Sequence, residues 1–172
     1  HTFVPAVAAA GVTCVLVEPT KGRQLAETHG WTMVAPGGHV PAQWQGPLLI
    51  AVSQPLQALQ QLARWHRARL APSWVVGITG SVGKTSTKEV VGALLNAHLP
   101  TLKSPRSYNS ESTLPLVALE LSAQHQAAVF EMGMYTAGEI ALLAGIARPN
   151  IGVVTAVGPS HLERMGSIEA IT

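Results

Sequence analysis

A glycine-rich turn between an apolar strand and a helix is the most constraining feature of this sequence. The segment Gly77–Ser86 reads GITGSVGKTS and overlaps the end of the apolar run Trp74–Thr79. Glycine accepts backbone conformations that are closed to other residues, so the chain can close tightly around an anion here. Backbone N–H groups and the N-terminus of the following helix then face that anion. The segment therefore predicts a phosphate-binding strand–turn–helix unit.

The turn matches a variant of the phosphate-binding loop, T-G-x-x-G-K-[ST]. The strict pattern, G-x-x-x-x-G-K-[ST], needs a glycine at the position of Ile78. By chance, G-x-x-G-K-[ST] arises in well under about 1 in 100 chains of this length. Lys84 would reach the β- and γ-phosphates, and the Thr85 hydroxyl would bind Mg²⁺. The alternative is an ordinary glycine-rich turn with an exposed lysine. The predicted nucleotide contacts are Thr79, Gly80, Ser81, Val82, Gly83, Lys84, Thr85 and Ser86.

Strands and helices alternate on both sides of this turn. Strands are expected over Trp74–Thr79, Ala127–Glu131 and Ile151–Thr155, and helices over 84–98, 114–122 and 138–147. Residues 103–112 are expected to form a polar loop. Strands that alternate with helices of this length form a parallel sheet with helices on both faces. The prediction is an α/β fold of the P-loop NTPase type.

The first 72 residues are predicted to form part of a smaller α/β domain. Helices are expected over Phe3–Ala10 and from Pro55, and strands over Val12–Val17, near Trp31–Val34 and over Leu48–Val52. Apart from the short strand near Trp31, the stretch from Pro19 to Pro47 has no periodicity and is predicted to be loop. Pro72 ends the second helix, so we place the domain boundary there and divide the chain into residues 1–72 and 73–172.

Composition excludes several other classes of protein. Only 12% of the 172 residues are charged and 47% are hydrophobic, against a charged fraction of roughly 25% in typical domains. Disorder is therefore excluded as the overall description. A net charge of +2 without blocks of like charge does not indicate a basic nucleic-acid-binding surface. The single cysteine, Cys14, excludes an intrachain disulfide, and no apolar run reaches the roughly 18 residues that span a bilayer.

Three further polar residues are predicted to lie near the turn. Glu131 ends an apolar strand, and ligands of open parallel sheets collect beyond the C-terminal ends of the strands. A carboxylate there helps to hold the metal of a phosphate-binding loop, although a solvated strand-end carboxylate is the alternative. His161 follows the next strand, as a metal ligand or as a loop hydrogen-bonding group. Asn109 is either a substrate contact or a turn residue.

Four segments together resemble the Mur ligases of peptidoglycan synthesis, which are ATP-dependent amide-forming enzymes. GITGSVGKTST at residues 77–87 is similar to their GxTGxxGKT signature, and EMGMYTAGEI at 131–140 to an E-[ML]-G…GEI segment. SHLERMGS at 160–167 resembles AHLE-x-x-GS, and YNSESTLPL at 108–116 matches YNN-E…G-V-P-L in part. The last three patterns are those of the branch that adds D-alanyl-D-alanine to UDP-N-acetylmuramoyl-tripeptide. More faintly, residues 1–17 resemble the second half of the family's UDP-binding first domain.

The resemblance implies a reaction and a role for each candidate residue. ATP would phosphorylate the terminal carboxylate of UDP-N-acetylmuramoyl-peptide, and the amine of D-alanyl-D-alanine would displace the phosphate. Lys84 and His161 would be catalytic, with Lys84 stabilising the transferring phosphoryl group. Thr85, Glu131 and His161 would hold Mg²⁺, and Asn109 would lie near the substrate. The expected location is the bacterial cytoplasm.

Three functional hypotheses are carried forward. The first is a piece of the D-alanyl-D-alanine-adding ligase that holds the ATP site. The second is another Mur-type ligase, and the third is a non-catalytic ATP-binding module. The chain begins with His1 and stops at Thr172 after the expected start of a helix, so we interpret it as part of a longer ligase. As an isolated chain it is expected to bind Mg·ATP weakly and to ligate nothing. The sequence is silent on oligomeric state, for which a monomer is the default expectation.

Overall fold

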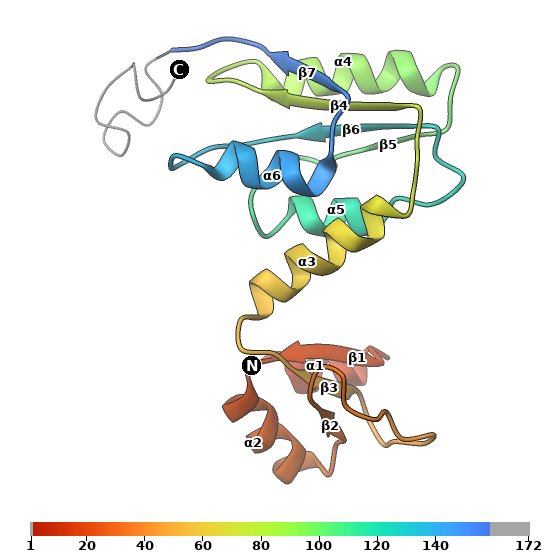
Figure 1. Ribbon diagram of the computed structural model, residues 1–172, viewed down its shortest axis with the longest axis vertical. Helices are drawn as coiled ribbons and strands as arrows, with labels where there is room; N and C mark the ends of the chain where they lie inside the picture. Colours follow the sequence, from red (N-terminus) through yellow and green to blue (C-terminus); the bar gives the residue numbers. More distant parts are fainter. Residues whose placement is uncertain (1, 159–172) are drawn as a thin grey trace. The chain divides into compact units, whose positions relative to one another are not determined.

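The computed structural model describes residues 2–158 of the chain, which forms two compact units (Figure 1). The first unit is His1–Leu59 and the second is Gln60–Thr172. The division falls inside helix α3, which runs from Pro55 to Ala68. Within the described residues, no helix is long and apolar enough to cross a membrane.

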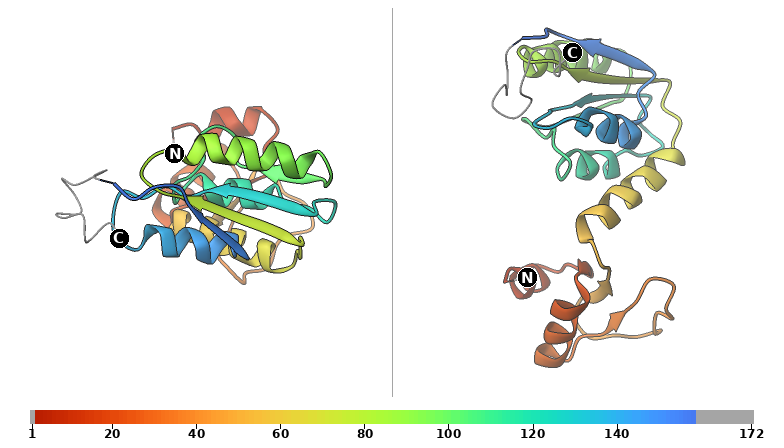
Figure 2. Two further views of the ribbon diagram at one scale, coloured as in Figure 1. Left: turned by 90° about the horizontal axis from the view of Figure 1, so that it is seen from above. Right: turned by 60° about the vertical axis from the view of Figure 1, so that its left-hand side comes forward.

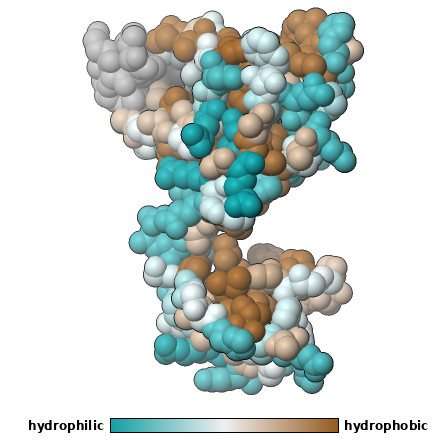
Figure 3. Space-filling model, turned by 45° about the vertical axis from the view of Figure 1, so that its right-hand side comes forward, coloured by the Kyte–Doolittle hydropathy of each residue, from teal (hydrophilic) through white to brown (hydrophobic). Residues whose placement is uncertain are grey.

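The first unit is a small parallel sheet with two helices. Its elements are α1 (Val4–Ala9), β1 (Cys14–Val17), α2 (Pro19–His29), β2 (Met33–Val34) and β3 (Leu48–Ala51). The strand order is β1-β3-β2, and both pairings are parallel. Three buried side chains, Val4, Val17 and Leu49, form the core of this unit. Much of its apolar surface stays exposed, as the apolar patch on the lower part of Figure 3 shows.

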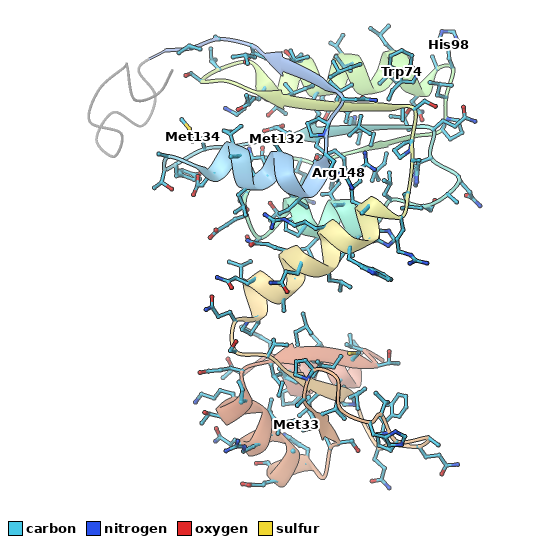
Figure 4. All side chains as sticks on the ribbon, in the orientation of Figure 1. Met33, Trp74, His98, Met132, Met134 and Arg148 are labelled. Atoms are coloured by element: carbon cyan, nitrogen blue, oxygen red, sulfur yellow. The ribbon has the colours of Figure 1, made fainter. Side chains whose placement is uncertain are left out.

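Helix α2 corrects the prediction of a loop after Pro19. The helix occupies 11 residues, with Pro19 in its first turn and Gly30 in the left-handed conformation, at φ 68°, directly after its last. Both are ordinary start and stop signals. The sequence of this helix shows no apolar stripe, because the residue that it buries is Gly22, which has no side chain. A Cβ at Gly22 would come within 2.8 Å of both Met33 Sδ and Val17 Cγ2, so the helix lies directly on the sheet (Figure 4).

The second unit is a four-stranded parallel sheet with helices on both faces. Its elements are β4 (Trp74–Thr79), α4 (Lys84–Asn96), β5 (Thr101–Lys103), α5 (Leu114–Leu119), β6 (Ala127–Glu131), α6 (Glu139–Ala147) and β7 (Ile151–Val154). The strand order is β5-β6-β4-β7. Helix α4 covers one face, whereas α5 and α6 cover the other (Figure 2). The predicted α/β fold is confirmed, and the short strand β5 is an addition to it.

Alternation along β6 determines where its terminal carboxylate points. Phe130 packs into the large apolar core with α5 and α6, whereas Val129 packs into a separate core with α4. Successive side chains of a strand point to opposite faces, so Glu131 lies on the face of Val129. That face carries α4, and all five residues of β6 are buried. Glu131 is therefore directed toward the start of α4.

Arg67 ties the end of α3 to the end of α6 within the second unit. Its Nε donates to the Ala147 carbonyl at 2.8 Å, and its Nη2 donates to the Arg148 carbonyl at 3.2 Å. Burial, and secondarily the nearby Arg148 charge, lower the pKa of Arg67 below its usual value. Arg148 stands at the C-terminal end of α6, whereas Met132 and Met134 lie near the opposite end, where the strands of the sheet end (Figure 4). The candidate site lies at that edge of the sheet.

Candidate nucleotide-binding site

The glycine-rich turn lies between the end of β4 and the start of α4, as predicted. Gly80 has φ 132° and Gly83 has φ 88°, and both values lie in the region that only glycine adopts readily. Gly83 is the N-cap of α4, so the turn leads directly to the positive end of the helix dipole. Val82, between the two glycines, is 70% exposed. The turn is therefore exposed to solvent, and its glycines and the helix N-terminus suit the close approach of an anion.

The segment that follows β7 is hydrogen-bonded to the turn. Thr155 Oγ1 lies 2.6 Å from the Val82 carbonyl oxygen and 3.1 Å from that of Thr79. The Ser81 N–H donates to the Ala156 carbonyl at 2.8 Å. These contacts join residues more than seventy positions apart and hold the turn in one conformation.

Lys84 lies over the turn and is held by backbone oxygens. Its Nζ donates to the Gly80 carbonyl at 2.6 Å, and the Ser81 carbonyl oxygen is 3.4 Å away. Among residues 2–158, no carboxylate lies within ion-pair distance of this ammonium group. Its charge is therefore available to an anion in the turn.

Thr85, Asn109 and Glu131 meet in one hydrogen-bonded cluster. The Oε1 atom of Glu131 accepts a hydrogen bond from Thr85 Oγ1 at 3.2 Å and one from Asn109 Nδ2 at 2.8 Å. Glu131 is only 1% exposed, and its Oε2 atom has no hydrogen-bond partner. The structure thus brings together three residues that were predicted from separate segments. The fourth, His161, lies outside the described residues.

Lys88 is a member of the cluster that sequence reasoning missed. Its side chain is fully buried, and its Nζ lies 3.5 Å from Glu131 Oε2 and 3.1 Å from Glu89 Oε1. It also donates to the Arg106 carbonyl. A signal was present in the sequence, because residues four apart lie on one face of a helix and Lys88 follows Lys84 at that spacing. The buried ammonium balances a buried carboxylate that would otherwise be uncompensated.

The donor atoms at Thr85 and Glu131 fit a magnesium ion. The Thr85 hydroxyl and the Glu131 carboxylate are hard oxygen donors 3.2 Å apart, and Oε2 of the carboxylate has the Lys88 ion pair but no hydrogen bond. In the described part of the chain, no group of three or more acidic, His or Cys residues forms a complete metal site. Mg²⁺ commonly takes one or two protein oxygens and completes its shell with phosphates and water. The site fits an ion that arrives with a nucleotide.

Comparison with known proteins agrees with the parallel sheet and its phosphate-binding turn. The family described as the Mur ligase middle domain matches residues 78–172. The chain is 37% identical over 172 residues to the UDP-N-acetylmuramoyl-tripeptide–D-alanyl-D-alanine ligase of Synechocystis sp., and 35% identical over 171 residues to that of Bacillus subtilis. These alignments cover 99% of this chain and 33% of each relative, so the chain spans about a third of their length. The chain belongs to the Mur ligase family.

Two solved structures show the same fold. MurF from Acinetobacter baumannii aligns with a TM-score of 0.69 and 35% identity, covering 72% of this chain and 27% of that one. MurF ligase from Thermotoga maritima, in complex with ADP, aligns with a TM-score of 0.71 and 30% identity, covering 93% and 38%. At these identities the chain resembles both proteins in sequence as well as in fold.

Proposed function

We propose that this chain binds ATP and provides the phosphoryl-transfer site of a ligase that adds D-alanyl-D-alanine to UDP-N-acetylmuramoyl-tripeptide. The cluster of Thr85, Asn109 and Glu131 beside the glycine-rich turn carries the proposal. The names of the Synechocystis and Bacillus relatives support the substrates, and the ADP in the Thermotoga structure supports the nucleotide. We propose the bacterial cytoplasm as its location, because its proposed substrates are ATP and an activated sugar nucleotide.

The proposed reaction has two steps. An oxygen of the terminal carboxylate of the tripeptide attacks the γ-phosphorus of ATP, the bond to the β-phosphate oxygen breaks, and ADP leaves. The amine nitrogen of D-alanyl-D-alanine then attacks the acyl carbon of the resulting acyl phosphate. The acyl carbon–oxygen bond breaks, inorganic phosphate leaves, and the nitrogen loses a proton as the amide forms.

The residues of this chain act mainly by positioning and electrostatics. The turn amides and the N-terminus of α4 bind the phosphates, and Lys84 neutralises charge that develops on the transferring group. Thr85 and Glu131 would hold Mg²⁺, which supplies charge stabilisation to the phosphates when bound. Asn109 fixes the Glu131 carboxylate and stands near the substrate in this proposal. His161 completes the catalytic and metal-binding set in this proposal, and the first unit forms part of the UDP-substrate domain.

A ligation assay tests the proposed function. The protein is produced from its complete reading frame and incubated with ATP, Mg²⁺, UDP-N-acetylmuramoyl-tripeptide and D-alanyl-D-alanine. We expect equimolar phosphate release and a product whose mass is the sum of the two substrates less one water. Lys84→Ala should abolish both signals, whereas Lys21→Ala, at an exposed lysine of the first unit, should leave them unchanged. ATP binding without any amide product would contradict the ligase assignment.

A further inference from the structure

We propose that Thr155 is a positioning residue for the ATP site, acting through the orientation of peptide groups in the glycine-rich turn. This inference rests on the proposed function, because it concerns how the same turn is prepared for phosphate. Thr155 directly follows β7 and is distant in sequence from the turn that it contacts. Three peptide groups of the turn are hydrogen-bonded to Thr155, to Ala156 or to Lys84.

The first two peptide groups have their carbonyls directed toward Thr155. The Thr79 carbonyl accepts the Thr155 N–H at 2.9 Å and lies 3.1 Å from its hydroxyl oxygen. The Val82 carbonyl lies 2.6 Å from the same hydroxyl oxygen. A trans peptide group is planar, with its C=O and N–H pointing in opposite directions. The N–H groups of Gly80 and Gly83 therefore point away from Thr155.

The third peptide group, between Gly80 and Ser81, has the opposite orientation. Its N–H, on Ser81, donates to the Ala156 carbonyl, and its C=O, on Gly80, accepts from Lys84 Nζ at 2.6 Å. The carbonyl therefore lies on the side of the turn where Lys84 stands. Of these three groups, those that carry the Gly80 and Gly83 amides present N–H donors on that side. Thr155 thus orients two of these groups so that the Gly80 and Gly83 amides face the side of Lys84, where a phosphate would bind.

The close approach of Thr155 adds a second reason for glycine at position 80, beside its φ of 132°. A Cβ on Gly80 would lie 2.3 Å from Thr155 Oγ1, a distance that real Cβ atoms do not show. At Gly83 the nearest atom to such a Cβ is Thr155 Cβ, at 3.7 Å, which is ordinary contact. Threonine suits this position because its β-branch restricts χ1 and holds the hydroxyl in one direction. The absence of a side chain at Gly80 therefore leaves room for the Thr155 hydroxyl beside the turn.

ATP affinity of the complete protein tests the role of Thr155. Thr155→Val keeps the side-chain shape and removes the hydroxyl, so we expect ATP to bind about tenfold more weakly. Thr155→Ser keeps the hydroxyl and should bind ATP within about twofold of the parent. The matched control is Thr101→Val, because the Thr101 hydroxyl also donates to a backbone carbonyl, that of Leu99 at 2.8 Å, but on β5. That variant should bind ATP like the parent.

Amide NMR separates positioning from general stability. In the parent, ATP should shift the Gly80 and Gly83 amide resonances, and both shifts should shrink in Thr155→Val and return in Thr155→Ser. If Thr155→Val does not fold, Thr155→Ala replaces it with the same expected loss. Parental affinity in the hydroxyl-free variant would overturn the role of Thr155. Failure of the parent itself to bind ATP would instead overturn the proposed function.

Discussion

The two parallel sheets of this chain differ in what they can bury. In the first unit, three side chains form the core, and β1 contributes one of them, Val17. In the second unit, helices cover both faces, and every residue of β6 is buried, including the charged Glu131. A buried carboxylate needs surroundings that supply donors and a balancing cation. The covered sheet can therefore hold polar groups in fixed positions at its edge, whereas the small sheet packs only a local apolar core.

Among the differences between the two units, the buried charge pair of the second unit should give the largest effect, at Lys88. Lys88→Met leaves the buried Glu131 without its cation, and removal of one partner of a buried pair costs about 3–5 kcal/mol in free energy of unfolding. Urea denaturation of the second unit measures this loss. The control is Lys103→Met, since Lys103 pairs with the half-exposed Glu89 at the surface. Equal losses from the two variants would contradict the buried-pair argument.

A glycine substitution in the turn is expected to have the next largest effect, on binding. In Gly80→Ala, the new Cβ collides with Thr155 Oγ1 and the turn must move. ATP affinity should fall about 100-fold, which corresponds to about 2.7 kcal/mol. Isothermal titration calorimetry of parent and variant provides the measurement. Gly152→Ala on β7 is the matched control, because a Cβ there meets nothing within 4 Å and ATP affinity should stay at the parent value.

Leu49→Ala tests whether the two units are energetically separate. Leu49 is fully buried in the first unit, and its truncation should cost about 2 kcal/mol, at the lower end for leucine because this small core can collapse around the gap. Hydrogen exchange of the β1 and β3 amides should report the loss, while ATP affinity should not change. Val40→Ala, at an exposed valine, is the control for stability. A parallel loss of ATP affinity would show that the first unit supports the site.

The smallest expected effect is a pH dependence at Glu89. Hydrogen bonds from Lys103, and next from Lys88, hold the pKa of Glu89 below its usual value. A depressed pKa in the folded state adds stability above the ordinary pKa, near 4.3, and this contribution is lost as pH falls through the lower folded-state value. The difference in thermal midpoint between the parent and Glu89→Gln should therefore narrow from about pH 6 to below about pH 4. High salt should reduce it, because this carboxylate is half exposed.

Patterns that depend on neighbouring residues alone predicted most of the second unit. Strands β4 and β6 have the bounds expected from their apolar runs, and the turn lies between strand and helix as its motif required. The meeting of Glu131 with Thr85 followed from the rule that parallel strands end at one edge. The strand bounds and the turn were predictable because strand period and glycine conformations are local properties, whereas the shared edge followed from the general topology of alternating strands and helices.

What the sequence did not reveal depends on contacts between distant segments. Helix α2 was missed because it is polar and rests on the sheet through Gly22. Lys88 was missed because lysine is ordinarily a surface residue, and only the packing of α4 on β6 shows that its side chain is buried. Thr155 gave no signal, because its partners are backbone carbonyls of another segment. The metal role of His161 stays a prediction.

The buried pair of Lys88 and Glu131 has a consequence for how such sequences diverge. Loss of Lys88 alone leaves the Glu131 carboxylate without its cation in the interior, whereas joint replacement of the pair by apolar residues is often tolerated. Substitutions at the two positions are therefore expected to occur together, although the positions are far apart in the sequence. A descendant that lost nucleotide chemistry, and with it Glu131, would keep Lys88 only for its contacts with Glu89 and the Arg106 carbonyl. Absence of both residues would then mark a lineage that has lost nucleotide chemistry at this edge of the sheet.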